Sequence, residues 1–177
     1  SMLALFELAK DEQYILMPTT NSAYGYGDIN NLCSENSELR PISQYAQEKV
    51  EVEKNLMSRP NSISFRLATV FGMSPRLRID LLVNDFVYRA VNDRFVVLFE
   101  SHFKRNYVHV RDVSRVFQHA LSNHANMKGE IYNVGLSDAN VSKRELCEHI
   151  QKQLPNFIFI DEQIGKDPDQ RNYIVSN

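Results

Sequence analysis

The stretch RPISQYAQEKVEVEKNLM, residues 40–57, decides how the rest of this sequence is interpreted. From Ser43, a residue type that caps helices well, helix-forming residues run without a break until Pro60. Tyr45 and Lys49 are four residues apart on the predicted helix, so their side chains share one face. They form either an ordinary pair on a solvated helix face or a phenol made more acidic by a neighbouring ammonium group.

The segments on both sides of this helix predict short strands that alternate with helices. Residues 13–20 and 62–72 are rich in apolar and β-branched side chains and predict strands, whereas residues 21–39 are rich in Gly, Asn and Ser and predict a loop. Further strands are predicted at residues 94–100, 105–110, 130–137 and 156–162, and further helices at residues 3–8, 79–93, 111–123 and 141–154. This alternation is typical of βαβ units, so we expect an α/β protein in which half of a doubly wound parallel sheet carries a small α/β lobe.

The composition narrows the classes of function. The 177 residues are 43% hydrophobic and 24% charged, with a formal net charge of −2, which is ordinary for a soluble globular protein. Lys and Arg are spread along the chain, so no nucleic acid partner is expected, and no apolar run is long enough to cross a membrane. Two cysteines are too few for a disulfide framework, and the five histidines lack a metal-ligand spacing, so we expect no metal site and a cytoplasmic location.

The Tyr45–Lys49 pair has a chemical use if a substrate lies beside it. A tyrosine normally loses its proton near pH 10, but a nearby cation stabilises the phenolate and brings its titration closer to neutrality, where acid/base catalysis operates. Thr20 ends the predicted strand 13–20, and ligands of open α/β sheets lie beyond the carboxyl ends of the strands. Its hydroxyl is therefore expected to hold a substrate oxygen while the phenol moves a proton.

At these residues the chain resembles the extended short-chain dehydrogenases/reductases, the NAD-dependent epimerases and dehydratases of nucleotide sugars. The family pattern is a Ser/Thr-rich strand end that runs into Tyr-Gly, followed by Tyr-x-x-x-Lys, and TTNSAYG and YAQEK match it here. The resemblance implies a Rossmann-like sheet in which Thr20 is the Ser/Thr of the catalytic triad. It also implies that Tyr45 is the acid/base and that Lys49 holds the nicotinamide ribose of NAD or NADP.

The resemblance extends to segments that bind substrate in the family, among them FRLATVFG, SPRLRIDLLVNDFV, KRNYVHVRDV and DPDQRNYIVSN. It implies a nucleotide-diphosphate sugar as the substrate, bound by Ser22, Thr69, Asn84, Arg105 and Arg171, and a cofactor contact at Leu67 beside Tyr45 and Lys49. A guanidinium group suits phosphate because it is always charged and donates two parallel hydrogen bonds. From the residues alone, each arginine is equally compatible with a solvated surface, and Asn84 with a local bond in its helix.

One family signature, Gly-x-x-Gly-x-x-Gly after the first strand, is absent from the sequence. The nearest approach, GYGDIN, is followed by loop residues instead of the helix that a pyrophosphate requires, so Gly25 and Gly27 are predicted to be turn residues. The resemblance then implies that this chain is part of a longer protein, with the glycine-rich half of the dinucleotide-binding domain before Ser1.

Two domains are expected on the same basis. Residues 1–72 are predicted to form the remaining part of the dinucleotide-binding domain, with the catalytic Thr, Tyr and Lys. Residues 73–177 are predicted to form mainly the substrate-binding lobe, with a strand and a helix at about 105–125 that return to the first sheet.

Three functions remain open at this stage. The first is a nucleotide-sugar epimerase or dehydratase that begins by oxidising a sugar hydroxyl, with epimerase favoured because Asn21 follows Thr20 where dehydratases tend to carry an acid. The second is a truncated, inactive relative that acts as a binding or homodimerising module through a helix seam of Val50, Val52, Leu56 and Met57. The third is a reductase of small carbonyl compounds, which should ignore nucleoside diphosphates.

Overall fold

The helix predicted around Tyr45 forms, and it lies on a parallel sheet. In the computed structural model, which describes residues 2–26, 31–162, 165 and 171–176, α2 (Gln44–Met57) begins after Ser43. The side chain of Ser43 accepts a hydrogen bond from the backbone N–H of Ala46, as expected for an N-cap. The sheet below α2 consists of β1 (Ile15–Thr20), β2 (Ser62–Leu67) and β6 (Ile131–Val134) in the order β1-β2-β6.

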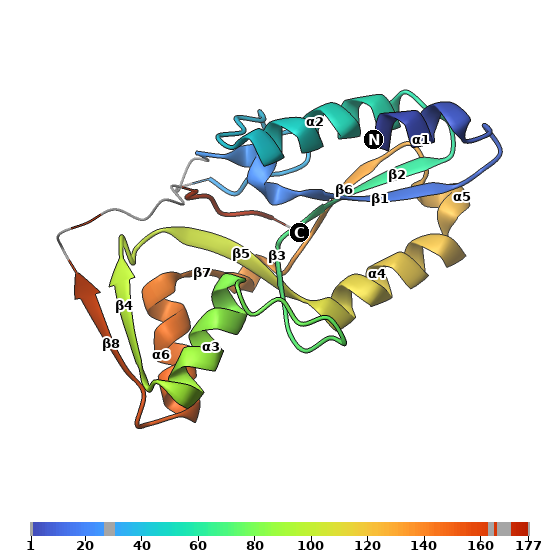
Figure 1. Ribbon diagram of the computed structural model, residues 1–177. Helices are drawn as coiled ribbons and strands as arrows, with labels where there is room; N and C mark the ends of the chain where they lie inside the picture. Colours follow the sequence, from blue (N-terminus) through green and yellow to red (C-terminus); the bar gives the residue numbers. More distant parts are fainter. Residues whose placement is uncertain (1, 27–30, 163–164, 166–170, 177) are drawn as a thin grey trace.

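The three parallel strands of this sheet end beside one another, so their carboxyl ends lie along one edge. Strands β1 and β2 pair in parallel from Ile15 with Ser62 to Thr20 with Leu67, and β6 pairs in parallel with β2 so that Val134 lies beside Leu67. Helices α1 (Met2–Leu8) and α2 cover one face, while α4 (Val110–Ser122) and α5 (His124–Met127) lie on the other (Figure 1). The carboxyl ends of three parallel strands therefore meet at one edge of a three-layer arrangement.

The remaining elements form a second cluster beside this sheet (Figure 1). A second sheet contains β3 (Thr69–Phe71), β5 (Lys104–His109) and β7 (Asn140–Ser142), with β5 parallel to β3 and antiparallel to β7. A third contains the parallel pair β4 (Phe95–Phe99) and β8 (Ile158–Glu162). Helices α3 (Leu82–Asn92) and α6 (Lys143–Gln153) pack together next to these strands, and the short helices η1 (Asn21–Tyr24) and η2 (Ser137–Ala139) follow β1 and β6. This α/β architecture with parallel strands confirms the predicted fold class.

Apolar packing on the α2 side of the sheet corrects one prediction. Leu56 is fully buried with Phe6 of α1 and Met17 of β1, while Val52 and Met57 pack against the same cluster. Val50 is also buried. The predicted intersubunit seam is therefore wrong for Val50 and Leu56, because their side chains are already covered within one chain.

Two further details differ from the sequence predictions. Residues 62–72 were expected to form one strand, but the strand breaks at Ala68 and the chain passes from the first sheet into the second. The predicted loop contains η1, which ends at Gly25 with φ of 59°. A Cβ at Gly25 would lie 1.8 Å from the carbonyl oxygen of Arg40, so this turn requires glycine. Gly27 lies outside the described residues.

Across residues 2–26, 31–162 and 171–176, no helix has the length and apolar character needed to cross a membrane. The same part of the chain holds no group of three or more His, Cys, Asp or Glu side chains placed to bind a metal ion.

Candidate active site

A cavity of about 540 Å³ lies at the carboxyl edge of β1 and β2. It brings together six of the residues predicted from the sequence to form the site, namely Thr20, Ser22, Tyr45, Leu67, Thr69 and Arg171. The other lining residues are Thr19, Ala68, Val70, Arg78, Leu81 and Tyr173. Residues far apart in the sequence thus meet where the parallel arrangement of β1 and β2 places a ligand.

Thr20 and Ser22 supply two hydroxyl groups on one side of the cavity. Thr20 ends β1 in an extended conformation, is 8% exposed, and caps η1 by accepting a 3.1 Å hydrogen bond from the backbone N–H of Ser22. Because the oxygen of Thr20 is used as an acceptor there, its hydroxyl proton can be donated to a ligand. The Ser22 hydroxyl, in turn, accepts a hydrogen bond from Nη1 of Arg171, which ties the C-terminal segment to this wall.

Tyr45 lines the same cavity from α2, whereas Lys49, one turn later on this helix, lies beside Tyr45 but is not among the lining residues. Tyr45 lies in the first turn and is 55% exposed, so its phenol is accessible from the cavity. The Nζ atom of Lys49 lies 6.0 Å from the centre of the Tyr45 ring and donates a 3.2 Å hydrogen bond to the carbonyl oxygen of Pro18. An ammonium group has three donors, and the bond to β1 uses one of those of Lys49.

The described residues that line the cavity include two arginines and no carboxylate. Arg171 binds Ser22, whereas the guanidinium of Arg78 forms paired hydrogen bonds of 2.8 Å and 2.6 Å with the carboxylate of Asp80. The hydrogen bond from Arg78 lowers the pKa of Asp80, so this pair stays ionised at neutral pH. The lining therefore carries two guanidinium groups, of which that of Arg78 is already paired with a carboxylate.

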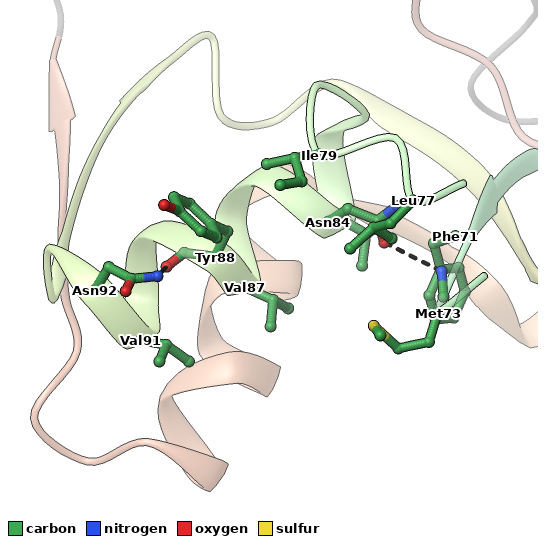
Figure 2. A pocket seen from close by; sticks show the side chains of 11 residues that line it. Phe71, Met73, Leu77, Ile79, Asn84, Val87, Tyr88, Val91 and Asn92 are labelled. Atoms are coloured by element: carbon green, nitrogen blue, oxygen red, sulfur yellow. Dashed lines mark hydrogen bonds between the residues drawn. The ribbon is translucent and has the colours of Figure 1, made fainter. Parts of the chain in front are cut away.

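Two predicted substrate contacts lie outside this cavity. Asn84, in the first turn of α3, accepts a 3.1 Å hydrogen bond from the backbone N–H of Gly72 (Figure 2). It also donates one of 3.0 Å to the carbonyl oxygen of Arg78. Its amide therefore holds the two ends of the loop between β3 and α3 together. Arg105 lies on β5 beside Val141 and is only 4% exposed.

Beside the loop, α3 borders an apolar groove of about 370 Å³. Val87, Val91 and Met73 point to the same side in Figure 2, with Phe71 close to the Asn84 end. The groove contains none of the predicted residues except Asn84.

A buried polar network behind the cavity was not predicted. Glu53 lies on α2 four residues after Lys49, and its carboxylate forms a 2.6 Å ion pair with Nη2 of Arg66 on β2. Thr19 and Ser64 also donate to this carboxylate, over 3.0 Å and 2.7 Å. Two sequence features could have indicated the network: Tyr45, Lys49 and Glu53 recur at the i, i+4, i+8 spacing, and the polar Ser62, Ser64 and Arg66 alternate with apolar residues along β2.

The chain matches a protein-family model described as the NAD dependent epimerase/dehydratase family over residues 1–135. Among solved structures, it is similar to a dTDP-glucose 4,6-dehydratase from Bacillus anthracis in complex with NAD, with a TM-score of 0.80 and 21% identity over 99% of this chain and 57% of that one. A Thermus thermophilus UDP-glucose 4-epimerase complex with NAD gives a TM-score of 0.78 at 22% identity, over 93% of this chain and 55% of that one. A UDP-N-acetylglucosamine 4-epimerase from Methanobrevibacter ruminantium gives a TM-score of 0.79 at 19% identity, over 99% of this chain and 58% of that one. The chain thus spans little more than half the length of these proteins, and at such identities the likeness shows a shared fold.

Proposed function

Because this chain belongs to the NAD dependent epimerase/dehydratase family, we propose that it forms the catalytic and substrate-binding part of an enzyme that oxidises a hydroxyl group of a nucleotide-diphosphate sugar, in an epimerase reaction. The main support is the cavity that Thr20, Ser22 and Tyr45 line together at the carboxyl edge of β1 and β2. Similar solved structures contain NAD, and one of them is in complex with UDP-glucuronic acid and NAD.

In the proposed reaction, Tyr45 moves the proton. Its phenolate accepts the proton of the sugar hydroxyl as the carbon–hydrogen bond beside it breaks, and Thr20 donates a hydrogen bond to the same sugar oxygen. NAD or NADP supplies the hydride acceptor when bound. The ammonium group of Lys49 is held 6.0 Å from the centre of the Tyr45 ring, with a hydrogen bond to the carbonyl oxygen of Pro18.

The residues of the cavity edge fit a nicotinamide riboside. Lys49 offers donors beyond its bond to Pro18, and Tyr45 offers a hydroxyl, so together they match the diol of a ribose. Leu67, paired with Thr20 at the end of β2, offers an apolar surface for the ring. These contacts belong to the part we assign to residues 1–72.

Residues 73–177 are assigned mainly to the substrate. Arg171 supplies the charge for the nucleotide phosphates at the cavity, and two residues of the first part, Thr69 and Ser22, add hydroxyls for the sugar. Arg105 is proposed as a second phosphate contact, and Asn84 as a residue that shapes the loop carrying Arg78. The absence of a carboxylate from the described cavity lining favours epimerisation over dehydration, which needs a further acid/base pair beside the ring.

Two measurements test this function. Isothermal titration calorimetry with UDP, GDP, CDP and dTDP should show binding of at least one nucleotide. If none of them binds, the small-carbonyl reductase and the inactive binding module are favoured instead. With the nucleotide sugar so identified and NAD or NADP, Tyr45→Phe is expected to lower kcat about 10²- to 10⁴-fold while the affinity for the nucleoside diphosphate stays near that of the wild type. A kcat close to wild type in this variant would remove Tyr45 from its role.

We also expect the protein to form a homodimer. Sedimentation equilibrium tests this oligomeric state.

A further inference from the structure

Directly behind the cavity, buried polar groups join α2 to η1 through β2. The side chains of Arg66 and Glu53 are 4% and 5% exposed, and they are held by the 2.6 Å ion pair and by bonds from Nε of Arg66 to both carboxylate oxygens, at 3.1 Å and 3.2 Å. Thr19 and Ser64 complete the hydrogen bonding of the carboxylate. Since Thr19 and Arg66 are paired neighbours on β1 and β2, Glu53 is anchored to both strands at once.

The other arm of the guanidinium reaches η1. Nη1 of Arg66 donates to the hydroxyl of Tyr24 at 3.0 Å and to the carbonyl oxygen of Glu35 at 3.0 Å. The Tyr24 hydroxyl donates in turn to Oδ1 of Asn133 on β6, at 2.7 Å. Burial raises the pKa of Tyr24, against the opposing charge of Arg66, so the hydroxyl keeps the proton that this bond to Asn133 requires.

The two segments joined by Arg66 are the two that carry the cavity hydroxyls. Glu53 and Tyr45 lie on the same helix two turns apart, and Tyr24 belongs to the short helix that contains Ser22 and is capped by Thr20. We propose that Arg66 and Glu53 are positioning residues, which set the separation between Tyr45 and the hydroxyls of Thr20 and Ser22. The proposal rests on the function proposed above.

The physical reason is the directional character of these bonds. Apolar contacts between α2 and the sheet, such as those of Leu56, favour burial without prescribing one angle or one shift along the helix axis. A guanidinium–carboxylate pair with several short bonds has a narrow geometry, and α2 cannot slide or rotate on β1 and β2 without breaking it. A buried pair also contributes little net stability compared with apolar residues, so its main effect here is on geometry.

The first test follows Tyr45 directly in the isolated chain. With ¹³C-labelled tyrosine, the Cζ resonance of Tyr45 is assigned by its loss in Tyr45→Phe and then compared between Arg66→Lys and Arg59→Lys. Lysine keeps the charge but lacks the fork that contacts both Glu53 and Tyr24. Arg59 is a matched control, because it ties the far end of α2 to α1 through the carbonyl oxygens of Phe6 and Ala9.

The expected result is a displaced Tyr45 resonance in Arg66→Lys and an unchanged one in Arg59→Lys, although both variants melt at lower temperature. An unchanged resonance in Arg66→Lys, or equal displacement in both, overturns the proposal. If Arg66→Lys does not fold, Glu53→Gln is compared with Glu51→Gln, whose side chain is exposed on the same helix. A Tyr45 resonance displaced in Glu53→Gln alone supports the proposal, and an unchanged resonance or equal displacement in both variants overturns it.

The second test separates positioning from binding. With a nucleotide sugar that the wild type turns over, Arg66→Lys is expected to lower kcat about tenfold to a hundredfold, with KM changed less than about threefold. Arg59→Lys should keep both constants. A raised KM with unchanged kcat contradicts the proposal. If the wild type shows no turnover, the proposed function fails, and the resonance of Tyr45 still decides whether Arg66 positions it.

Discussion

Helices α2 and α3 both carry a predicted site residue in their first turn, but they use it in opposite ways. In α2, Tyr45 projects into the cavity while the residues two turns later fix the helix to the sheet. In α3, Asn84 turns its amide toward the preceding loop, and the exposed face of the helix is apolar. A first-turn residue is therefore free to act on a ligand where the anchoring is done elsewhere on the helix. The predictions below test that division between anchoring and presenting residues.

The largest effect on stability is expected where α2 is anchored. Glu53→Leu leaves the guanidinium of Arg66 buried without its partner, which should lower the free energy of unfolding by about 3–5 kcal/mol. Urea denaturation followed by circular dichroism measures this change. Glu51→Leu, at an exposed position of the same helix, should stay within about 0.5 kcal/mol of the wild type.

The double variant Glu53→Leu with Arg66→Leu sharpens the result. Because replacing both members of a buried pair is often nearly neutral, it should recover most of the lost stability. A double variant as unstable as the single one would mean that the Thr19, Ser64 and Tyr24 contacts, and not the unpaired charge, dominate the loss.

A smaller effect is expected where α3 holds its loop. Asn84→Ala removes the hydrogen bonds to Gly72 and Arg78 and should lower the free energy of unfolding by about 1–2 kcal/mol. Its matched control is Asn92→Ala, since the amide of Asn92 donates to the carbonyl oxygen of Tyr88 within the same helix (Figure 2). Hydrogen exchange should increase at residues 72–78 in the first variant alone. Equal exchange in both variants would remove Asn84 from this role.

The N-termini of α2 and α3 also differ, and the cap of α2 is expected to contribute about 1 kcal/mol to the free energy of unfolding. Helix α2 is capped by Ser43, whereas α3 begins after Leu81 with no side-chain cap. Ser43→Ala should therefore lower the free energy of unfolding by about 1 kcal/mol, and Ser43→Asp should keep it, because aspartate also accepts the bond from Ala46. Thermal melts of the two variants measure the difference. A loss of similar size in both would show that the cap contributes little.

The local features of α2 could be predicted from the sequence because they depend on neighbouring residues. Ser43 as the cap, and Tyr45 and Lys49 on one face, follow from helical spacing, and the meeting of Thr20 with Leu67 follows from parallel strands that end together. The roles of the side chains in catalysis stay predictions.

The long-range features could not be predicted in the same way. Glu53 meets Arg66 only because of how α2 lies across β1 and β2, which helical spacing does not determine. The break at Ala68 has no Gly or Pro to mark it, and the orientation of Asn84 depends on the path of a loop whose ends it joins.

The smallest effect is expected on the exposed face of α3. Val83 and Phe86 are buried, whereas Val91 is 58% exposed; both Val83 and Val91 line the apolar groove. Val91→Ser should therefore change the free energy of unfolding by no more than about 0.5 kcal/mol, while Val83→Ser should cost about 2 kcal/mol because it places a hydroxyl in the core. Urea denaturation of both variants provides the comparison. A cost at Val91 as large as that at Val83 would mean that exposed residues of α3 also anchor the helix, and the contrast with α2 would then disappear.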